Sequence, residues 1–171
     1  DARTFHQSRF RLLAHGAAEL SEGVDLRAHL IANLPGAFAP NVDVGIGWRP
    51  LLWLGTEVDL GWSFQTDEPI VTADVSPASG QWWAWIHAEF QPKSRGGYYF
   101  VQGERTVTSW IDLGVESEGW GGMQDVDSWS HGLGPNALIH FGDRMRVDLA
   151  LHAREMHGLR PEFFVRWHLF L

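Results

Sequence analysis

The chain has 171 residues, a formal net charge of −8 at pH 7, no cysteine, ten tryptophans and 19 glycines. This length fits one domain, and the acidic balance argues against a nucleic-acid partner, because phosphate binding needs a basic surface. Without cysteine the chain cannot form a disulfide, a zinc–thiolate site or a thiol nucleophile. No apolar run reaches the roughly 18–20 residues that a membrane-spanning helix needs.

Apolar and polar residues alternate along most of the chain, which is the period of a β-strand with two different faces. In Val24–Leu34, for example, Leu26 and Leu30 share one face, and Arg27 and His29 share the other. The segments that this alternation predicts as strands are Arg9–Leu20, Val24–Leu34, Val42–Arg49, Leu54–Phe64, Trp82–Phe90, Thr106–Ser117, Ala137–Phe141, Met145–Glu155 and Phe163–Leu171.

Two stretches, Thr66–Gly80 and Glu118–Pro135, are rich in Gly, Pro, Ser and Asp, and they are predicted as long loops. The nine predicted strands make an odd number, whereas single-chain bacterial barrels normally have an even number. Omitting Ala137–Phe141 gives eight strands, and adding Tyr98–Gln102 gives ten. Eight is preferred, because 171 residues at roughly 10 per strand leave room for two long loops.

The last strand, Phe163–Leu171, places Val165, Trp167 and Leu169 on one face and Arg166 and His168 on the other. An amphipathic strand at the end of the chain resembles the C-terminal signal of bacterial outer-membrane β-barrels. It departs from that pattern at its last residue, which is Leu where Phe or Trp is common.

The pattern of the whole chain is similar to that of small bacterial outer-membrane β-barrels, although no motif of a specific family stands within it. The resemblance implies an all-β fold in which residues 1–171 form a single antiparallel transmembrane β-barrel in the bacterial outer membrane, surrounded by its lipid. The first residues lack an apolar signal core, so we expect the export signal to be absent from this sequence.

A soluble lipocalin-like barrel that binds a small apolar ligand is the main structural alternative, because alternation alone does not say which face lies inside. Glycines such as Gly45 and Gly47 on the polar face suit a narrow lumen better than a solvated surface. Tryptophans on the apolar face near strand ends also favour a membrane barrel, because aromatic residues gather at membrane interfaces. These tryptophans are Trp48, Trp62, Trp82 and Trp167.

In a membrane barrel the polar face would fill the lumen with paired charges and histidines. The residues that we expect in this lumen network are His15, Glu19, Asp25, Arg27, His29, Arg49, Glu57, Asp59, His87, Glu89, Asp112, Glu116, Arg146, Asp148, His152, Arg154, Arg166 and His168. Imidazoles beside carboxylates can bind a transition metal or relay protons. None of the spacings is a known metal motif, so a hydrogen-bonded plug without metal or cofactor is the prediction.

Trp83 and Trp85 lie on the same face as His87, and they are a candidate aromatic platform for a sugar or an acyl chain.

Ser130, His131 and Glu155 are the candidate catalytic set of an alternative function, a lipid A or phospholipid deacylase. Adjacent residues of an extended chain point apart, and the chain has no Gly-x-Ser-x-Gly elbow. We therefore expect a non-enzymatic structural or anchoring protein, whose long loops bind a glycan or another subunit of an outer-membrane assembly.

Overall fold

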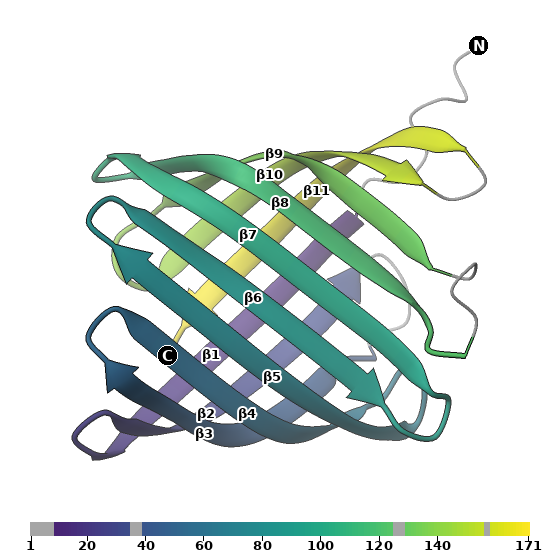
Figure 1. The fold of residues 1–171 in the computed structure, drawn as a ribbon, viewed down its shortest axis with the longest axis horizontal. Helices are drawn as coiled ribbons and strands as arrows, with labels where there is room; N and C mark the ends of the chain where they lie inside the picture. The colour runs from purple at the N-terminus through teal and green to yellow at the C-terminus, as the bar shows by residue number, and fades with distance from the viewer. Residues whose placement is uncertain (1–8, 35–38, 125–128, 156–157) are drawn as a thin grey trace.

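The structure is a computed structural model that describes residues 9–34, 39–124, 129–155 and 158–171. These residues contain eleven strands and no helix, and the strands close into one barrel (Figure 1). The strands are β1 (Arg9–Ser21), β2 (Val24–Leu34), β3 (Asn41–Leu51), β4 (Leu54–Ser63), β5 (Glu68–Ser79), β6 (Trp82–Gln91), β7 (Gly96–Thr108), β8 (Ile111–Gly122), β9 (Ser130–His140), β10 (Met145–Glu155) and β11 (Leu159–Phe170). The predicted all-β barrel is confirmed, but the predicted count of eight strands, or ten, is wrong.

The odd number of strands decides how the barrel closes. Each strand pairs antiparallel with the next, so β1 and β11 run in the same direction and must pair in parallel. Their pairing extends from Arg9 opposite Phe164 to His15 opposite Phe170. The prediction of a purely antiparallel barrel is therefore wrong at one strand pair. This is the pair of β1 and β11, drawn in purple and yellow side by side in Figure 1.

The strands that the sequence did not predict lie largely in the segments predicted as loops. Thr66–Gly80 contains β5, and Glu118–Pro135 contains the end of β8 and the start of β9, which leaves residues 123–129 as the connection. The predicted strand Thr106–Ser117 instead spans the end of β7, a turn and the start of β8. These segments contain proline and glycine, which are typical of loops, but their polar and apolar residues still alternate as in a strand.

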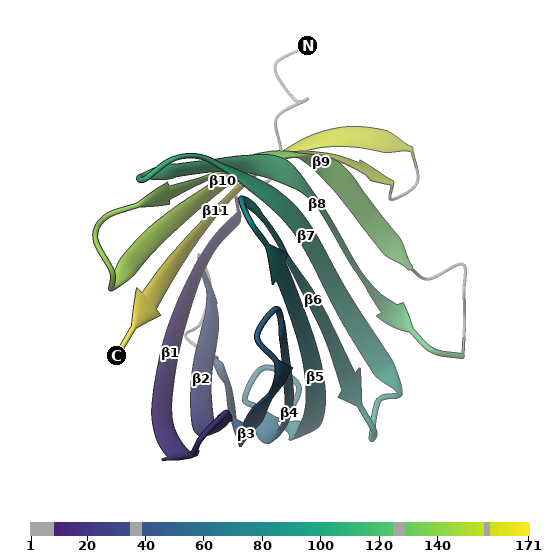
Figure 2. The same ribbon diagram turned by 60° about the vertical axis from the view of Figure 1, so that its left-hand side comes forward.

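The two ends of the barrel differ. The tight turns that follow β1, β3, β5, β7 and β9 lie at one end together with the C-terminus, on the left of Figure 1. We call this end the short-turn end. The view in Figure 2 separates the wall into β2 to β5 below and β8 to β11 above.

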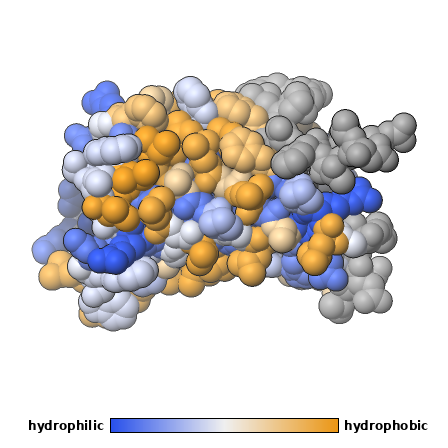
Figure 3. Space-filling view, turned by 90° about the horizontal axis from the view of Figure 1, so that it is seen from above, coloured by the Kyte–Doolittle hydropathy of each residue, from blue (hydrophilic) through white to orange (hydrophobic). Residues whose placement is uncertain are grey.

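The interior of the barrel is polar and its exterior is apolar. Neighbouring residues of one strand show the contrast, since Asp59 is 1 % exposed and Leu60 is 69 % exposed. The same holds in β8, where Glu116 is buried and Val115 is exposed. Apolar side chains cover much of the face seen in Figure 3. This arrangement is the reverse of a lipocalin-like barrel, which needs its apolar face inside.

Tryptophans lie on the outer surface near the ends of the strands. Trp48 and Trp82, together with Trp53 and Trp110 in the turns, are exposed at the short-turn end, and Trp62 is exposed near the other end. Between them the strands carry Val, Leu and Ile on the outer face. A strand of 11 residues tilted by about 45° spans roughly 25 Å, which matches an apolar bilayer core.

Gly134 allows β9 and β10 to approach closely. A Cβ atom at this position would lie 1.8 Å from the carbonyl oxygen of Leu151, so a backbone would have to move. We predict that Gly134→Ala lowers the free energy of unfolding by roughly 1–3 kcal/mol, because the added methyl group overpacks the strand pair. Denaturant unfolding in detergent, followed by tryptophan fluorescence, measures this change.

Gly103→Ala is the matched control, because a Cβ atom at Gly103 meets nothing within 4 Å. Its effect should stay within about 0.5 kcal/mol. Equal effects of the two substitutions would contradict the close approach at Gly134.

Candidate functional site

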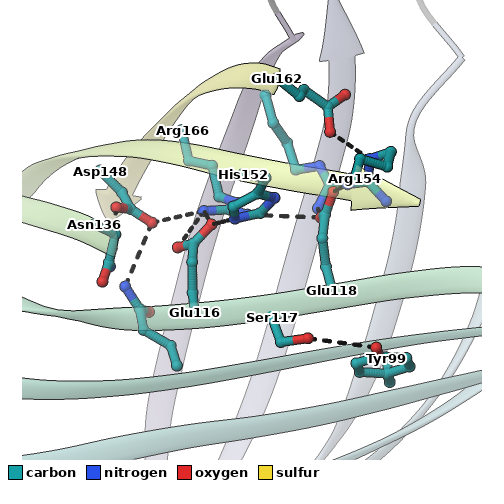
Figure 4. A network of polar contacts seen from close by, with 12 residues as sticks. Tyr99, Glu116, Ser117, Glu118, Asn136, Asp148, His152, Arg154, Glu162 and Arg166 are labelled. Carbon is teal, nitrogen blue, oxygen red and sulfur yellow. Dashed lines mark hydrogen bonds and ion pairs between the residues drawn. The ribbon is translucent and has the colours of Figure 1, made fainter. Parts of the chain in front are cut away.

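Side chains of two different kinds fill the lumen. Between β7 and β11 lies a network of arginines, carboxylates and one histidine, which we call the guanidinium network (Figure 4). Between β1 and β6, with contributions from β10 and β11, lies a cavity of about 320 Å³ that we call the histidine cavity. The guanidinium network consists of Glu116, Glu118, Asp148, His152, Arg154, Glu162 and Arg166. The histidines that line the histidine cavity are His15, His29, His87 and His168.

Arg166 is the central cation of the guanidinium network. One of its terminal nitrogens lies 2.7 Å from both a Glu116 and an Asp148 oxygen, and the other lies 3.6 Å from Glu118. The side chain is fully buried, and its guanidinium carbon lies 4.1 Å from the ring centre of Phe164. Because three carboxylates face one arginine, this cation offsets charges that would otherwise repel one another in a buried site.

Arg154 bridges Glu118 and the fourth carboxylate of the network, Glu162. It donates hydrogen bonds to Glu118 and to Glu162, and it lies 4.1 Å above the ring of Trp120. His152 contacts Glu116 through Nε2 at 2.6 Å. The network thus joins β8, β10 and β11 across the lumen, and its side chains occupy that half of the barrel.

The histidine cavity is organised differently, because imidazoles take the place of guanidinium groups. His15 and His29 meet with their Nδ1 atoms 2.7 Å apart, and Nε2 of His29 lies 2.5 Å from Glu57. Arg27 donates to the other Glu57 oxygen at 2.8 Å. Asp59, on the same face of β4, accepts a hydrogen bond of 2.8 Å from the Thr72 hydroxyl.

Trp83 and Trp85 both line the histidine cavity, as the expected platform requires. Their indole N–H groups are already engaged, since Trp83 donates to Asp112 at 3.1 Å and Trp85 donates to Asp74. Trp85 also packs edge-on against Phe100, with ring centres 5.1 Å apart. These contacts hold both rings as part of the cavity wall.

Two groups of side chains bring metal-type donor atoms within 4.8 Å of one another in the described residues. One is His29, Glu57 and Asp59 in the histidine cavity, and the other is Glu118, His152 and Glu162 in the guanidinium network. In each group the histidine lies on a different strand from the carboxylates, and His29 is 28 residues from Glu57, so no spacing motif could reveal either group.

The structure places the predicted lumen residues on the inner face almost throughout. Glu19 and Arg49 are the exceptions, because both lie at the short-turn rim and are exposed, although Arg49 still contacts Asp25 at 3.3 Å. Sequence reasoning missed other buried polar residues of the lumen. These are Asp43, Glu68, Gln102, Glu104, Glu118, Asn136 and Glu162. Most of them lie in strands that were not predicted or were predicted with the wrong bounds.

Ser130 and His131 face opposite sides of the barrel wall. Ser130 is buried and its hydroxyl lies 3.3 Å from the backbone oxygen of Glu155, whereas His131 is exposed on the outer surface. Nδ1 of His131 contacts the Tyr99 hydroxyl at 2.9 Å, and its ring stacks on Trp129. The candidate catalytic serine and histidine therefore do not form a nucleophile–base pair.

No protein-family model matches the chain, and a search of curated proteins finds no relative. The described part of the chain contains no helix long and apolar enough to cross a membrane. Function must therefore be inferred from the barrel's own geometry.

Removal of the central arginine should leave the Glu116 and Asp148 carboxylates without their main counter-charge. We predict that Arg166→Met lowers the free energy of unfolding by roughly 3–5 kcal/mol, measured by denaturant unfolding in detergent. Adding Glu116→Gln and Asp148→Asn should recover part of this loss, because the unpaired charges are then removed.

Arg49→Met is the control for this experiment, since Arg49 forms an exposed ion pair with Asp25. It should cost at most about 1 kcal/mol. An Arg166→Met variant as stable as the parent would show that the network does not hold the barrel together.

Proposed function

We propose that the protein is a membrane-embedded β-barrel of the bacterial outer membrane, with an anchoring or structural role and a lumen closed by its own side chains. The observation that carries this proposal is the reversed polarity of the barrel, with buried charges inside and exposed apolar residues outside. In water such an exterior would be unfavourable, because a contiguous apolar belt drives association. In lipid the same belt is the favourable surface.

Exposed tryptophans at both ends of the barrel support the same location. Indole rings favour the membrane–water interface, where one part of the ring is apolar and its N–H group can reach water. Tyr99, Trp129 and His131 form a stacked group on the outer surface, at the end opposite the short turns. This group fits contact with the polar headgroups of lipids.

The closed lumen supports an anchoring role over solute conduction. Arg154 and Arg166 tie β8, β10 and β11 together through buried ion pairs, so a solute could not pass through that half of the barrel without breaking them. Recognition of a partner subunit or a glycan would then fall to the connections between strands, where barrels normally carry binding surfaces. The segment between β8 and β9 is the one we propose for this contact, and its residues 125–128 lie outside the described residues.

Location is tested by expressing the chain with an export signal and isolating outer membranes. Unboiled and boiled samples are then compared on SDS gels. Recovery in the outer membrane with a mobility shift on boiling is the expected result, because a folded barrel resists SDS until it is heated. Recovery as a soluble protein without a shift would overturn the proposal.

A charge on the outer face should be costly only if this face lies in lipid. We predict that Leu60→Arg lowers the stability of the barrel in bilayers by roughly 2–4 kcal/mol if Leu60 lies near the midplane. Leu52→Arg is the matched control, because Leu52 is fully exposed in the β3–β4 turn. Unfolding in lipid vesicles measures both, and equal tolerance of the two variants would contradict a lipid-facing belt.

The closed lumen is tested by reconstitution into planar bilayers. We predict no single-channel steps for the parent protein, since side chains of the guanidinium network fill one half of the lumen and the buried polar side chains around the histidine cavity narrow the other. Reproducible steps whose ion selectivity changes in an Arg27→Glu variant would show instead that the barrel conducts ions.

A further inference from the structure

We propose that the histidine cavity binds one divalent transition-metal cation, with His29, Glu57 and Asp59 as its ligands. This site goes beyond the anchoring role, and it does not depend on where the barrel is located. Its chemistry is that of a zinc-type site, in which one imidazole nitrogen and two carboxylate oxygens hold the ion.

The strand register brings the three ligands together over β3. His29 lies on β2 and the two carboxylates lie on β4, so β3 runs between them. At the intervening positions, however, β3 carries Gly45 opposite Asp59 and Gly47 opposite Glu57. A Cβ atom at Gly45 would lie 2.0 Å from a carboxylate oxygen of Asp59. Glycine at position 45 therefore leaves room for the Asp59 carboxylate, whereas the Arg27 side chain fills the space at Gly47. The donor atoms of the three ligands lie within 4.8 Å of one another.

A neighbouring histidine supports the orientation of the imidazole ligand. If Nε2 of His29 binds the cation, its Nδ1 carries the proton and donates to His15, whose Nδ1 lies 2.7 Å away. Metal-binding histidines commonly donate their second N–H to a fixed partner in this way. His15 also stacks on His168, with ring centres 5.7 Å apart, so its own position is fixed.

The charge around the cluster also favours a cation. Asp59 and Asp43 both line the cavity, each is at most 3 % exposed, and each has one oxygen without a hydrogen-bond partner. Among the described residues, no lysine or arginine forms an ion pair with either carboxylate, because the nearby Arg27 binds Glu57 and Asp25. Burial of a carboxylate without a counter-charge is unfavourable, and a divalent cation would supply that charge.

In the second group of donor atoms, both carboxylates already have a guanidinium partner. There Arg154 binds both Glu118 and Glu162, so a guanidinium group provides positive charge between them. In the histidine cavity Arg27 binds Glu57, but among the described residues no arginine or lysine forms an ion pair with Asp59. This difference assigns the metal to the histidine cavity.

The cavity offers an entry path from the short-turn end. Its wall includes Trp83, Arg146 and Phe170, which lie at or next to the ends of β6, β10 and β11. A hydrated ion could therefore approach through the mouth of the barrel without crossing the guanidinium network.

The test is zinc binding by the purified, folded barrel in detergent after treatment with a chelator. Equilibrium dialysis against zinc chloride with elemental analysis should give one zinc per barrel, and cobalt(II) should give the visible spectrum of an ion bound by nitrogen and oxygen. His29→Gln and Asp59→Asn should each weaken zinc binding by at least about 100-fold, because removal of even a supporting partner typically costs 10–100-fold.

Glu162→Gln is the matched control, since it alters the second cluster and should leave the affinity for zinc unchanged. Circular dichroism confirms that each variant is folded, and Glu57→Gln replaces any variant that is not. No zinc bound by the parent would overturn the proposal, as would full binding by the His29 and Asp59 variants. Loss of zinc in Glu162→Gln alone would place the ion in the other cluster and would overturn it equally. None of these results depends on membrane location.

Discussion

The rest of this structure depends on one constraint: the barrel buries charged side chains in its lumen and exposes apolar side chains on its outer surface. Once Glu116, Glu118 and Asp148 point into the lumen, they need buried cations, and Arg154 and Arg166 supply them. The same alternation that turns these residues inward turns Val115 and Leu113 outward. The period of the β-strand therefore links the polar lumen to the apolar outer surface, on which the proposed membrane location rests.

The lumen meets this constraint in two ways. In the half formed by β7 to β11, guanidinium groups pair with the carboxylates and donate several hydrogen bonds each, which gives a closed plug. The half formed by β1 to β6 has histidines in their place and a cavity beside two carboxylates without arginine partners. We interpret the first half as structural and the second as the region that can exchange a ligand.

The sequence predicts the strand periodicity well, and the apolar and polar faces that it assigns agree with the structure. It fails where polar or breaker residues keep the alternation but resemble a loop, as in β5, which begins with Glu68-Pro69 and contains Pro77. The clusters in the lumen could not be predicted, because they depend on the register between strands. His29 and Asp59 are 30 residues apart, and only the pairing of β2, β3 and β4 brings them together.

The most direct test of the account is lipid exposure, residue by residue, along β4. The chain has no cysteine, so single cysteines at Glu57, Val58, Asp59 and Leu60 can carry a fluorescent label in vesicles that contain brominated lipid. We predict strong quenching at Val58 and Leu60 and weak quenching at Glu57 and Asp59. Uniform quenching, or the opposite alternation, would contradict a barrel with charge inside and lipid outside.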